Sequence, residues 1–180
     1  MLEQPTIKWI KVVDVVEKER IAAAAKWYFF DNASFLASHP PVEVDWCDRS
    51  LVAQAVQQHE QPRYEMVQGP HAYLHIGFRR PDYQRQGFGS KWREWGLGEA
   101  DRLGLEIKLD ATDLGVPLYE KYNFQMAKVH ELRLVMPVNL TGSEVKEWKR
   151  CEEEFLPIRA TVMVRFSSGV PTESMVVNGS

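Results

Sequence analysis

The sequence predicts a mixed α/β (α+β) fold, in which helices flank a central sheet and a long insertion follows the first hairpin. Two observations predict it. Short apolar runs with strand character alternate with segments of helical periodicity. At the centre, a strand, a helix and a strand follow one another, which is typical of a right-handed crossover. The 180 residues suffice for one domain. We therefore expect a single domain at 1–166, with the insertion at about 31–68 and a flexible tail at 167–180.

Composition excludes several classes of protein. Hydrophobic residues make up 44% and charged residues 26% of the chain, as in globular proteins. The formal net charge is -3 and no Lys/Arg run stands out, so we expect no nucleic-acid partner and no membrane partner. The sequence shows no signal peptide and no transmembrane segment, and two cysteines are too few for a disulfide framework. The expected location is cytoplasmic.

The first elements are expected to form an antiparallel hairpin. Residues 7–16 and 21–30 are apolar, and a polar run at 17–20 links them. The alanines of the second run could instead be helical, and periodicity does not decide between these structures. The aromatic residues at 27–30 are expected to lie mostly in the core, with the lining of an acceptor pocket as the alternative.

The insertion at 31–68 has a different composition, with prolines, scattered acids and glutamines. Residues 50–59 could form a helix with one apolar face. Long loops of this kind are often lids or acceptor-binding elements.

Strand and helix patterns alternate through the rest of the chain. The expected elements are strands at 73–79 and 105–109, helices at 87–103 and 116–122, strands at 128–138 and 159–166, and a helix at 143–155. Gly104 and Asn123 accept the left-handed backbone angles common at helix ends, and Ser143 is the expected N-cap of the last helix. Gly96 and Gly98 should weaken the long helix by about 1 kcal/mol each relative to alanine.

The loop from Gln84 to Gly89 is the strongest candidate site. Gly87 and Gly89 lie at a strand–helix turn and would let the backbone approach a ligand closely. The following helix would point its first N–H groups and the positive end of its dipole at an anion such as a pyrophosphate, and Arg85 would add a cation. An ordinary tight turn is the alternative. The Gly-Lys-Ser/Thr ending of a Walker loop is absent, and Trp92 stands where a Rossmann loop needs its third glycine.

Two motifs in this region resemble those of a known family. Pro81-Asp82-Tyr83-Gln84-Arg85-Gln86-Gly87-Phe88-Gly89 is similar to the Gln/Arg-x-x-Gly-x-Gly/Ala loop of GNAT N-acetyltransferases, in the form common in fungal members. The segments at 100–105 and 115–124 also look like that branch. The resemblance covers about 7–166 and is sharpest at 73–124. It implies a single GNAT-like domain with a mixed, mostly antiparallel sheet.

The resemblance also implies a cofactor and a reaction. Acetyl-CoA would be the acyl donor, and an amine of a small molecule would attack it directly in a ternary complex. Strand 73–79 would bind the pantetheine arm through the backbone of Phe78 and Arg79, strand 105–109 would splay away, and Thr112 would touch the arm. The CoA-binding residues implied for the loop are Gln84, Arg85, Gln86, Gly87, Phe88, Gly89 and Ser90.

Three side chains are candidate catalytic groups. Tyr119 matches the family tyrosine near the CoA sulfur, where a phenol can protonate the departing thiolate. His75 matches histidines assigned to proton removal in aralkylamine N-acetyltransferases, and Tyr73 falls where histone-type members carry a glutamate base. Packed aromatic and structural roles are the alternatives for Tyr119 and His75. The histidines have no metal-ligand spacing, so no metal is expected.

The sequence departs from the family pattern in three respects. It begins at the hairpin, so the N-terminal strand and two helices that shape the acceptor site are expected to be missing, and a homodimer becomes plausible. Arg79 replaces a small β-branched residue, with Gly77 before it, and Asn123 and Trp92 replace a glycine and a leucine. Two alternatives therefore stay open: a non-acyl tailoring reaction in secondary metabolism, and a non-catalytic CoA-binding module.

Overall fold

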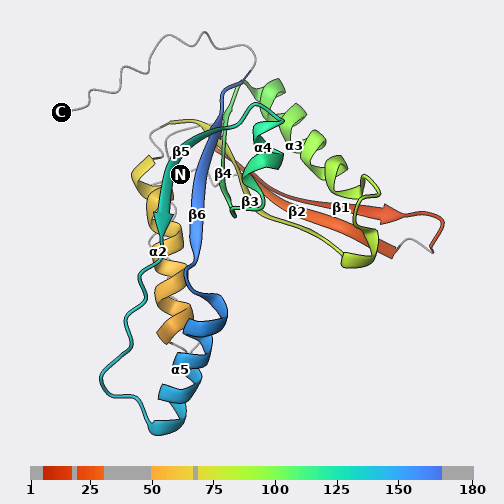
Figure 1. The fold of residues 1–180 in the computed structure, drawn as a ribbon. Coiled ribbons are helices and arrows are strands. Elements are labelled where there is room, and N and C mark those ends of the chain that lie inside the picture. Colours follow the sequence, from red (N-terminus) through yellow and green to blue (C-terminus); the bar gives the residue numbers. More distant parts are fainter. Residues whose placement is uncertain (1–5, 18–19, 31–49, 67–68, 168–180) are drawn as a thin grey trace.

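The computed structural model describes residues 6–17, 20–30, 50–66 and 69–167, and it holds one six-stranded sheet in the order β1-β2-β3-β4-β6-β5 (Figure 1). The elements are β1 (Thr6–Asp14), β2 (Arg20–Phe30), α2 (Ser50–Met66), β3 (His71–Arg79), the short 3-10 helix η1 (Pro81–Tyr83), α3 (Phe88–Leu103), β4 (Glu106–Ala111), α4 (Val116–Glu120), β5 (Gln125–Glu131), α5 (Gly142–Phe155) and β6 (Arg159–Arg165).

The sheet is mixed and mostly antiparallel, as the resemblance implies. Only β3 and β4 pair in parallel, and α3 connects them. The β1–β2 hairpin is confirmed, so the alanine run is a strand rather than a helix. Pairing with β1 on one side and β3 on the other outweighs the helix propensity of alanine.

Several element boundaries differ from the prediction. The N-cap of the last helix is Thr141 rather than Ser143: the Thr141 hydroxyl accepts from the backbone N–H of Glu144, and the Glu144 carboxylate accepts from the backbone N–H of Thr141. This reciprocal capping box satisfies two amide donors, which a cap at Ser143 would not. The fifth strand covers 125–131 rather than 128–138, and α2 reaches Met66 rather than residue 59. Of the insertion predicted at 31–68, residues 31–49 and 67–68 lie outside the described ranges, as does the tail from residue 168.

Two glutamines fix α2 to the chain that follows β5. The Gln54 side-chain amide donates to the carbonyl of Val135 at 2.8 Å and accepts from its N–H at 2.8 Å. Gln58, one helical turn later, makes the same pair of bonds with the backbone of Arg133, at 2.8 and 2.7 Å. Each glutamine therefore pairs with a peptide group as a neighbouring β-strand would.

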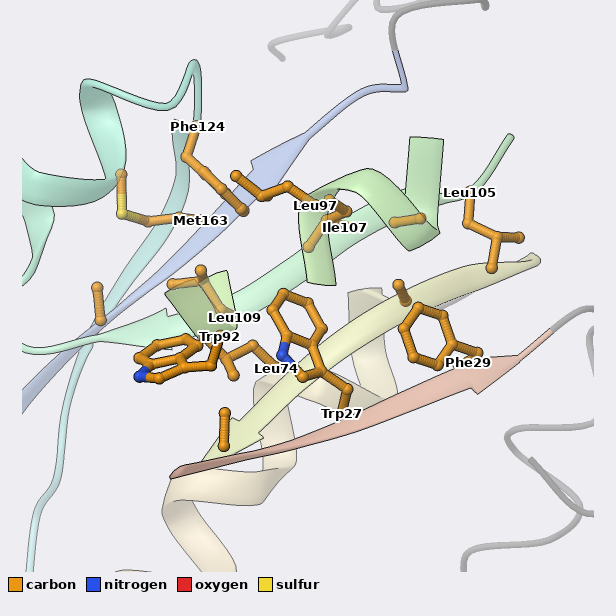
Figure 2. Packing of buried hydrophobic residues seen from close by; sticks show 14 of the residues in the cluster. Trp27, Phe29, Leu74, Trp92, Leu97, Leu105, Ile107, Leu109, Phe124 and Met163 are labelled. Atoms are coloured by element: carbon orange, nitrogen blue, oxygen red, sulfur yellow. The ribbon is translucent and has the colours of Figure 1, made fainter. Parts of the chain in front are cut away.

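The main core lies between the sheet and α3, and a tryptophan fills its centre (Figure 2). Trp27 and Phe29 of β2 face α3, whereas Tyr28 and Phe30 lie on the other face with Tyr73. Trp27 is 0% exposed, and it occupies the space where Gly96 of α3 would carry a Cβ atom. The glycine that weakens this helix is thus the residue that lets the helix approach the sheet.

A second glycine and tryptophan meet in the same way nearer the start of α3. A Cβ atom on Gly77 of β3 would lie 2.6 Å from Cη2 of Trp92. Gly77 and Trp92 were two separate departures from the family pattern. The structure shows that they compensate each other, because the large ring fills the space that a side chain on β3 would take.

We expect Gly96→Ala to destabilise the protein and Gly98→Ala to stabilise it. The new methyl group at position 96 would overlap the rigid Trp27 ring and should lower the free energy of unfolding by about 1–3 kcal/mol. Nothing lies within 4 Å of the corresponding position at Gly98. The higher helix propensity of alanine alone should therefore raise the free energy of unfolding by roughly 0.5–1 kcal/mol. Urea unfolding of both variants measures this, and equal effects would contradict the packing described for Trp27.

Candidate functional site

Strands β3 and β4 part at the middle of the sheet. Their paired residues run from His71 with Glu106 to Leu74 with Leu109, and pairing ends there. Beyond that point β4 pairs with β6, and β3 pairs only with β2 among the described strands. The N–H of Arg80 donates to the carbonyl of Ala22 in β2, so the N–H and C=O of Arg79 point to the opposite, open edge. An edge of this kind can hydrogen-bond an extended ligand.

A β-bulge at His75 lies where the strands part. Lys26 pairs with Ile76 and Trp27 with Leu74, so His75 has no opposing residue on β2. The extra residue reverses the alternation of side chains along β3. Leu74 faces α3 before the bulge, and Gly77 and Arg79 face it afterwards.

The loop before α3 is shaped by two left-handed residues, Arg85 with φ 61° and Gly87 with φ 78°. Tyr83 anchors it, buried against Phe88 with their ring centroids 5.0 Å apart. Among the described residues, the amides of residues 85–89 have no backbone partner, while that of Ser90 donates to Gly87. The N–H groups of residues 86–89 are four such donors at the N-terminus of the 16-residue helix α3, and the N–H of Arg85 is a fifth. A cluster of N–H donors at a helix N-terminus suits an anion.

Arg79 adds a cation to this loop. A Cβ atom on Gly89 would lie 3.3 Å from its guanidinium Nη1, so the side chain crosses the start of α3. The prediction for Arg79 concerned its backbone alone. The side chain reaches the loop because the bulge turns it toward α3, and that change of direction is invisible in the spacing of the sequence. Gln84 and Gln86 complete the loop, where the Gln86 side chain donates to the carbonyl of Asp82.

Tyr119 and Thr112 meet at the other side of the open edge, after β4. Gly115 separates them: a Cβ atom there would lie 3.4 Å from Thr112 Oγ1 and 3.4 Å from Tyr119 Cε2. The Tyr119 ring packs against Phe124, with centroids 5.6 Å apart. Burial raises the pKa of the Tyr119 phenol above its ordinary value, and the positive charge of Arg93 acts in the opposite direction.

Tyr73 and His75 lie on the face of the sheet away from α3. The Tyr73 hydroxyl donates to Oδ2 of Asp110 at 2.7 Å, across the point where β3 and β4 part. The ring of His75 lies edge-on to Tyr28, with centroids 5.4 Å apart, and 6.1 Å from that of Tyr73. Phe78, farther along β3, has a half-exposed side chain.

Sequence reasoning missed two residues here, Asp110 and Arg93. The other carboxylate oxygen of Asp110, Oδ1, is buried and has no hydrogen-bond partner within the described ranges. A carboxylate two residues before Thr112, near the end of an alternating strand, was the available signal. Arg93 is a buried cation on the apolar face of α3, and its signal was a charge next to Trp92 at a core position.

Two other features are absent from the described part of the chain. It holds no group of three or more His, Cys, Asp or Glu side chains that could ligate a metal ion. None of its helices combines the length and apolar character needed to cross a membrane.

Comparison with known proteins gives matches among solved structures. The sequence matches no protein-family model and no curated protein. The ribosomal-protein-S18-alanine N-acetyltransferase of Escherichia coli is similar over 97% of this chain and 77% of its own, at 17% identity and a TM-score of 0.50. Arabidopsis thaliana NAA60 with a bisubstrate analogue matches over 91% and 77%, at 10% identity and a TM-score of 0.53. Mosquito arylalkylamine N-acetyltransferase like 5b matches over 88% and 74%, at 13% identity and a TM-score of 0.51.

These three structures are acetyltransferases. Because their sequences are only 10–17% identical to this chain, the similarity is one of fold alone. In this chain the sheet holds the parallel β3–β4 pair, and β6 lies between β4 and β5. The element order, the sheet topology and this likeness together identify the fold of the chain as that of the GNAT N-acetyltransferases.

Proposed function

We propose that this protein is an N-acetyltransferase that uses acetyl-CoA to acetylate an amine. One observation carries the proposal: the open edge of β3 runs from the unpaired amides before α3 to the parting of β3 and β4, with Tyr119 and Asp110 beside it. Several structures of this fold carry acetyltransferase names, and one, NAA60, was solved in complex with acetyl-CoA.

The residues present fit acetyl-CoA as a substrate. We assign the pyrophosphate to the amides of residues 85–89, with the side chains of Arg79 and Arg85 as cations and Gln84 to Ser90 as the surrounding loop. The backbone of Arg79 would hold the pantetheine arm, and Thr112 would contact it from the far side. The backbone of Phe78, predicted to share this role, faces β2 instead and pairs with Ala24. The bound thioester supplies the acetyl group that the amine takes.

Tyr119 is the proposed general acid. It donates its phenolic proton to the sulfur as the carbon–sulfur bond breaks, and the sulfur keeps the electron pair of that bond. The phenol regains a proton from solvent afterwards. Its neutral form is the one that burial favours, so Tyr119 enters the reaction protonated.

Asp110 is the proposed proton acceptor, held by Tyr73. It takes the proton that the amine loses when its lone pair forms the bond to the acetyl carbon. The buried Oδ1 is available for an N–H of the amine, because Oδ2 already accepts from Tyr73. In this proposal Tyr73 orients the carboxylate of Asp110. His75, which lies beside Tyr28, is a second group that passes the proton through water.

We propose a small-molecule amine as the acceptor. Tyr73, which binds Asp110, packs with the aromatic side chains of Tyr28 and Phe30 on this face. A carboxylate beside aromatic rings suits a compact amine with an apolar body. Acetylation rates measured under the same conditions with such amines and with peptides carrying a free N-terminus test the proposed acceptor. Faster acetylation of the peptides would overturn it.

Acetyl-CoA should bind and raise the melting temperature, and Gly87→Ala should weaken that binding about 10-fold. An alanine at φ 78° is disfavoured by roughly 1–2 kcal/mol relative to glycine. The binding free energy should fall by this amount, because the loop must adopt that angle to present its amides. Calorimetric titration measures the dissociation constant, with Gly98→Ala, in open space on the same helix, as the matched control. No binding by the wild type at millimolar acetyl-CoA would exclude the proposed function.

Tyr119→Phe should lower kcat roughly 100-fold while changing the dissociation constant of acetyl-CoA little, because the hydroxyl acts on the departing sulfur. The pKa of Tyr119 is raised, so its protonated form persists through neutral and mildly alkaline pH. Deprotonation of Tyr119 should therefore reduce kcat only above about pH 10. Steady-state rates across pH measure both effects, and an unchanged kcat would remove Tyr119 from the chemistry.

Asp110→Asn should lower kcat/KM for the amine by roughly 100-fold, because the amide cannot accept the proton. Tyr73→Phe keeps the carboxylate but removes its orienting bond, so its loss should be smaller, about 10-fold. Initial rates with varied amine at saturating acetyl-CoA measure the ratio. If His75→Asn abolished activity while Asp110→Asn left it intact, the base would be His75.

A further inference from the structure

A buried arginine lies between α3 and the residues after α4. Arg93 is 6% exposed, and its Nη2 donates to the Tyr122 hydroxyl at 3.1 Å. The guanidinium lies 4.4 Å from the centre of the Tyr122 ring and 5.7 Å from that of Trp92. Figure 1 shows α4 beside α3, and the Arg93–Tyr122 hydrogen bond joins α3 to the turn after α4.

Within the described ranges, Arg93 has no carboxylate partner. Other charges of α3 are paired there: Arg102 with Glu99, and Asp101 with Arg165 of β6. The buried Nε of Arg93 has no hydrogen-bond partner among these residues. A buried cation without an anion is costly, and replacement by an apolar side chain of similar volume is often neutral or stabilising. A packing role alone therefore leaves the charge unexplained.

Tyr119 is the group on which this charge can act. Tyr122, which binds Arg93, lies one turn after Tyr119 and donates its N–H to the Tyr119 carbonyl. Both tyrosine rings pack on the same core cluster as Trp92. Burial raises the pKa of the Tyr119 phenol, and the positive charge of Arg93 acts in the opposite direction.

We infer that Arg93 is a positioning residue that holds positive charge behind Tyr119 and stabilises the phenolate that remains after Tyr119 has given up its proton. The inference rests on the proposed function. The proton moves from the Tyr119 oxygen to the sulfur, and the electron pair of the O–H bond stays on the oxygen. Arg93 keeps all its protons and supplies only its field.

This role answers a difficulty in the acid step. A phenol has an ordinary pKa of about 10 and a thiol one of about 8.5, so proton transfer to the sulfur is already uphill. Burial raises the pKa of Tyr119 further and makes the transfer harder. The positive charge of Arg93 offsets part of that penalty, because water screens a buried charge little.

The test uses Arg93→Met, with Arg102→Met as the matched control. Arg102 is on the same helix, exposed and remote from this contact. Difference titration of tyrosine absorbance against Tyr119→Phe gives the ionisation midpoint of Tyr119 without any substrate. We expect Arg93→Met to raise that midpoint by about one pH unit or more, to lower kcat about 10-fold, and to leave melting temperature and acetyl-CoA affinity nearly unchanged. Arg102→Met should change none of these quantities.

An unchanged Tyr119 midpoint in Arg93→Met would overturn the inference, whatever the activity. So would an unchanged kcat in an active enzyme. If Arg93→Met fails to fold, Arg93→Lys and Arg93→Gln replace it, and equal midpoints in the charged and neutral variants would overturn the inference. An inactive wild type with a raised midpoint in Arg93→Met would instead exclude the proposed function and leave the electrostatic link intact.

Discussion

The pairing of β3 with β4 begins at His71 and Glu106, ends at Leu74 and Leu109, and divides the sheet into two parts. On one side, β1 and β2 continue with β3; on the other, β6 and β5 continue with β4. The bulge at His75 falls at the point of division. It frees the backbone edge of β3 and turns Arg79 toward the start of α3, so the strand edge and the anion-binding loop come to serve one extended ligand.

The position of α3 depends on two contacts between a glycine and a tryptophan. Trp27 of β2 fits against Gly96 of the helix, and Trp92 of the helix fits against Gly77 of β3. In each pair the absent side chain makes room for a rigid ring, and the two pairs lie at different points along the helix. The amides before α3 are thereby fixed relative to the open edge, because interiors packed at this density do not tolerate sliding of one layer over another.

Most of the fold follows from local signals, and most of the site does not. Gly104 at φ 68° ends α3 as the sequence predicts, whereas α4 ends at Glu120 and Asn123, at φ 64°, lies in the turn that follows it. The alanine run was ambiguous because only its pairing with two strands makes it a strand. Ser143 and Thr141 are both good caps, and the position of Glu144 decides between them through the second bond of the box, from the Thr141 N–H to the Glu144 carboxylate.

The site depends on register, which the sequence does not display. Tyr73 meets Asp110 because two parallel strands pair with a particular offset, and Arg79 meets Gly89 because of one extra residue at His75. Arg93 stands in a run that reads as an ordinary helix, and its isolation from carboxylates within the described ranges is a property of the packed molecule. The motifs at residues 84–89 and 118–124 predicted where chemistry is expected but could not supply these partners.

The docking of α2 has a consequence for how this protein can vary. Gln54 and Gln58 bind only the backbone of Val135 and Arg133. The side chains of Val135 and Arg133 take no part in these bonds, and Val135 is 70% exposed. The segment after β5 can therefore change its side chains while keeping its place against the helix. Because the bonds join neutral amides, ionic strength and pH should hardly affect the attachment, in contrast to the Arg80–Asp82 pair before α3. The segment at residues 133–135 can therefore carry different side chains while its backbone stays attached to α2.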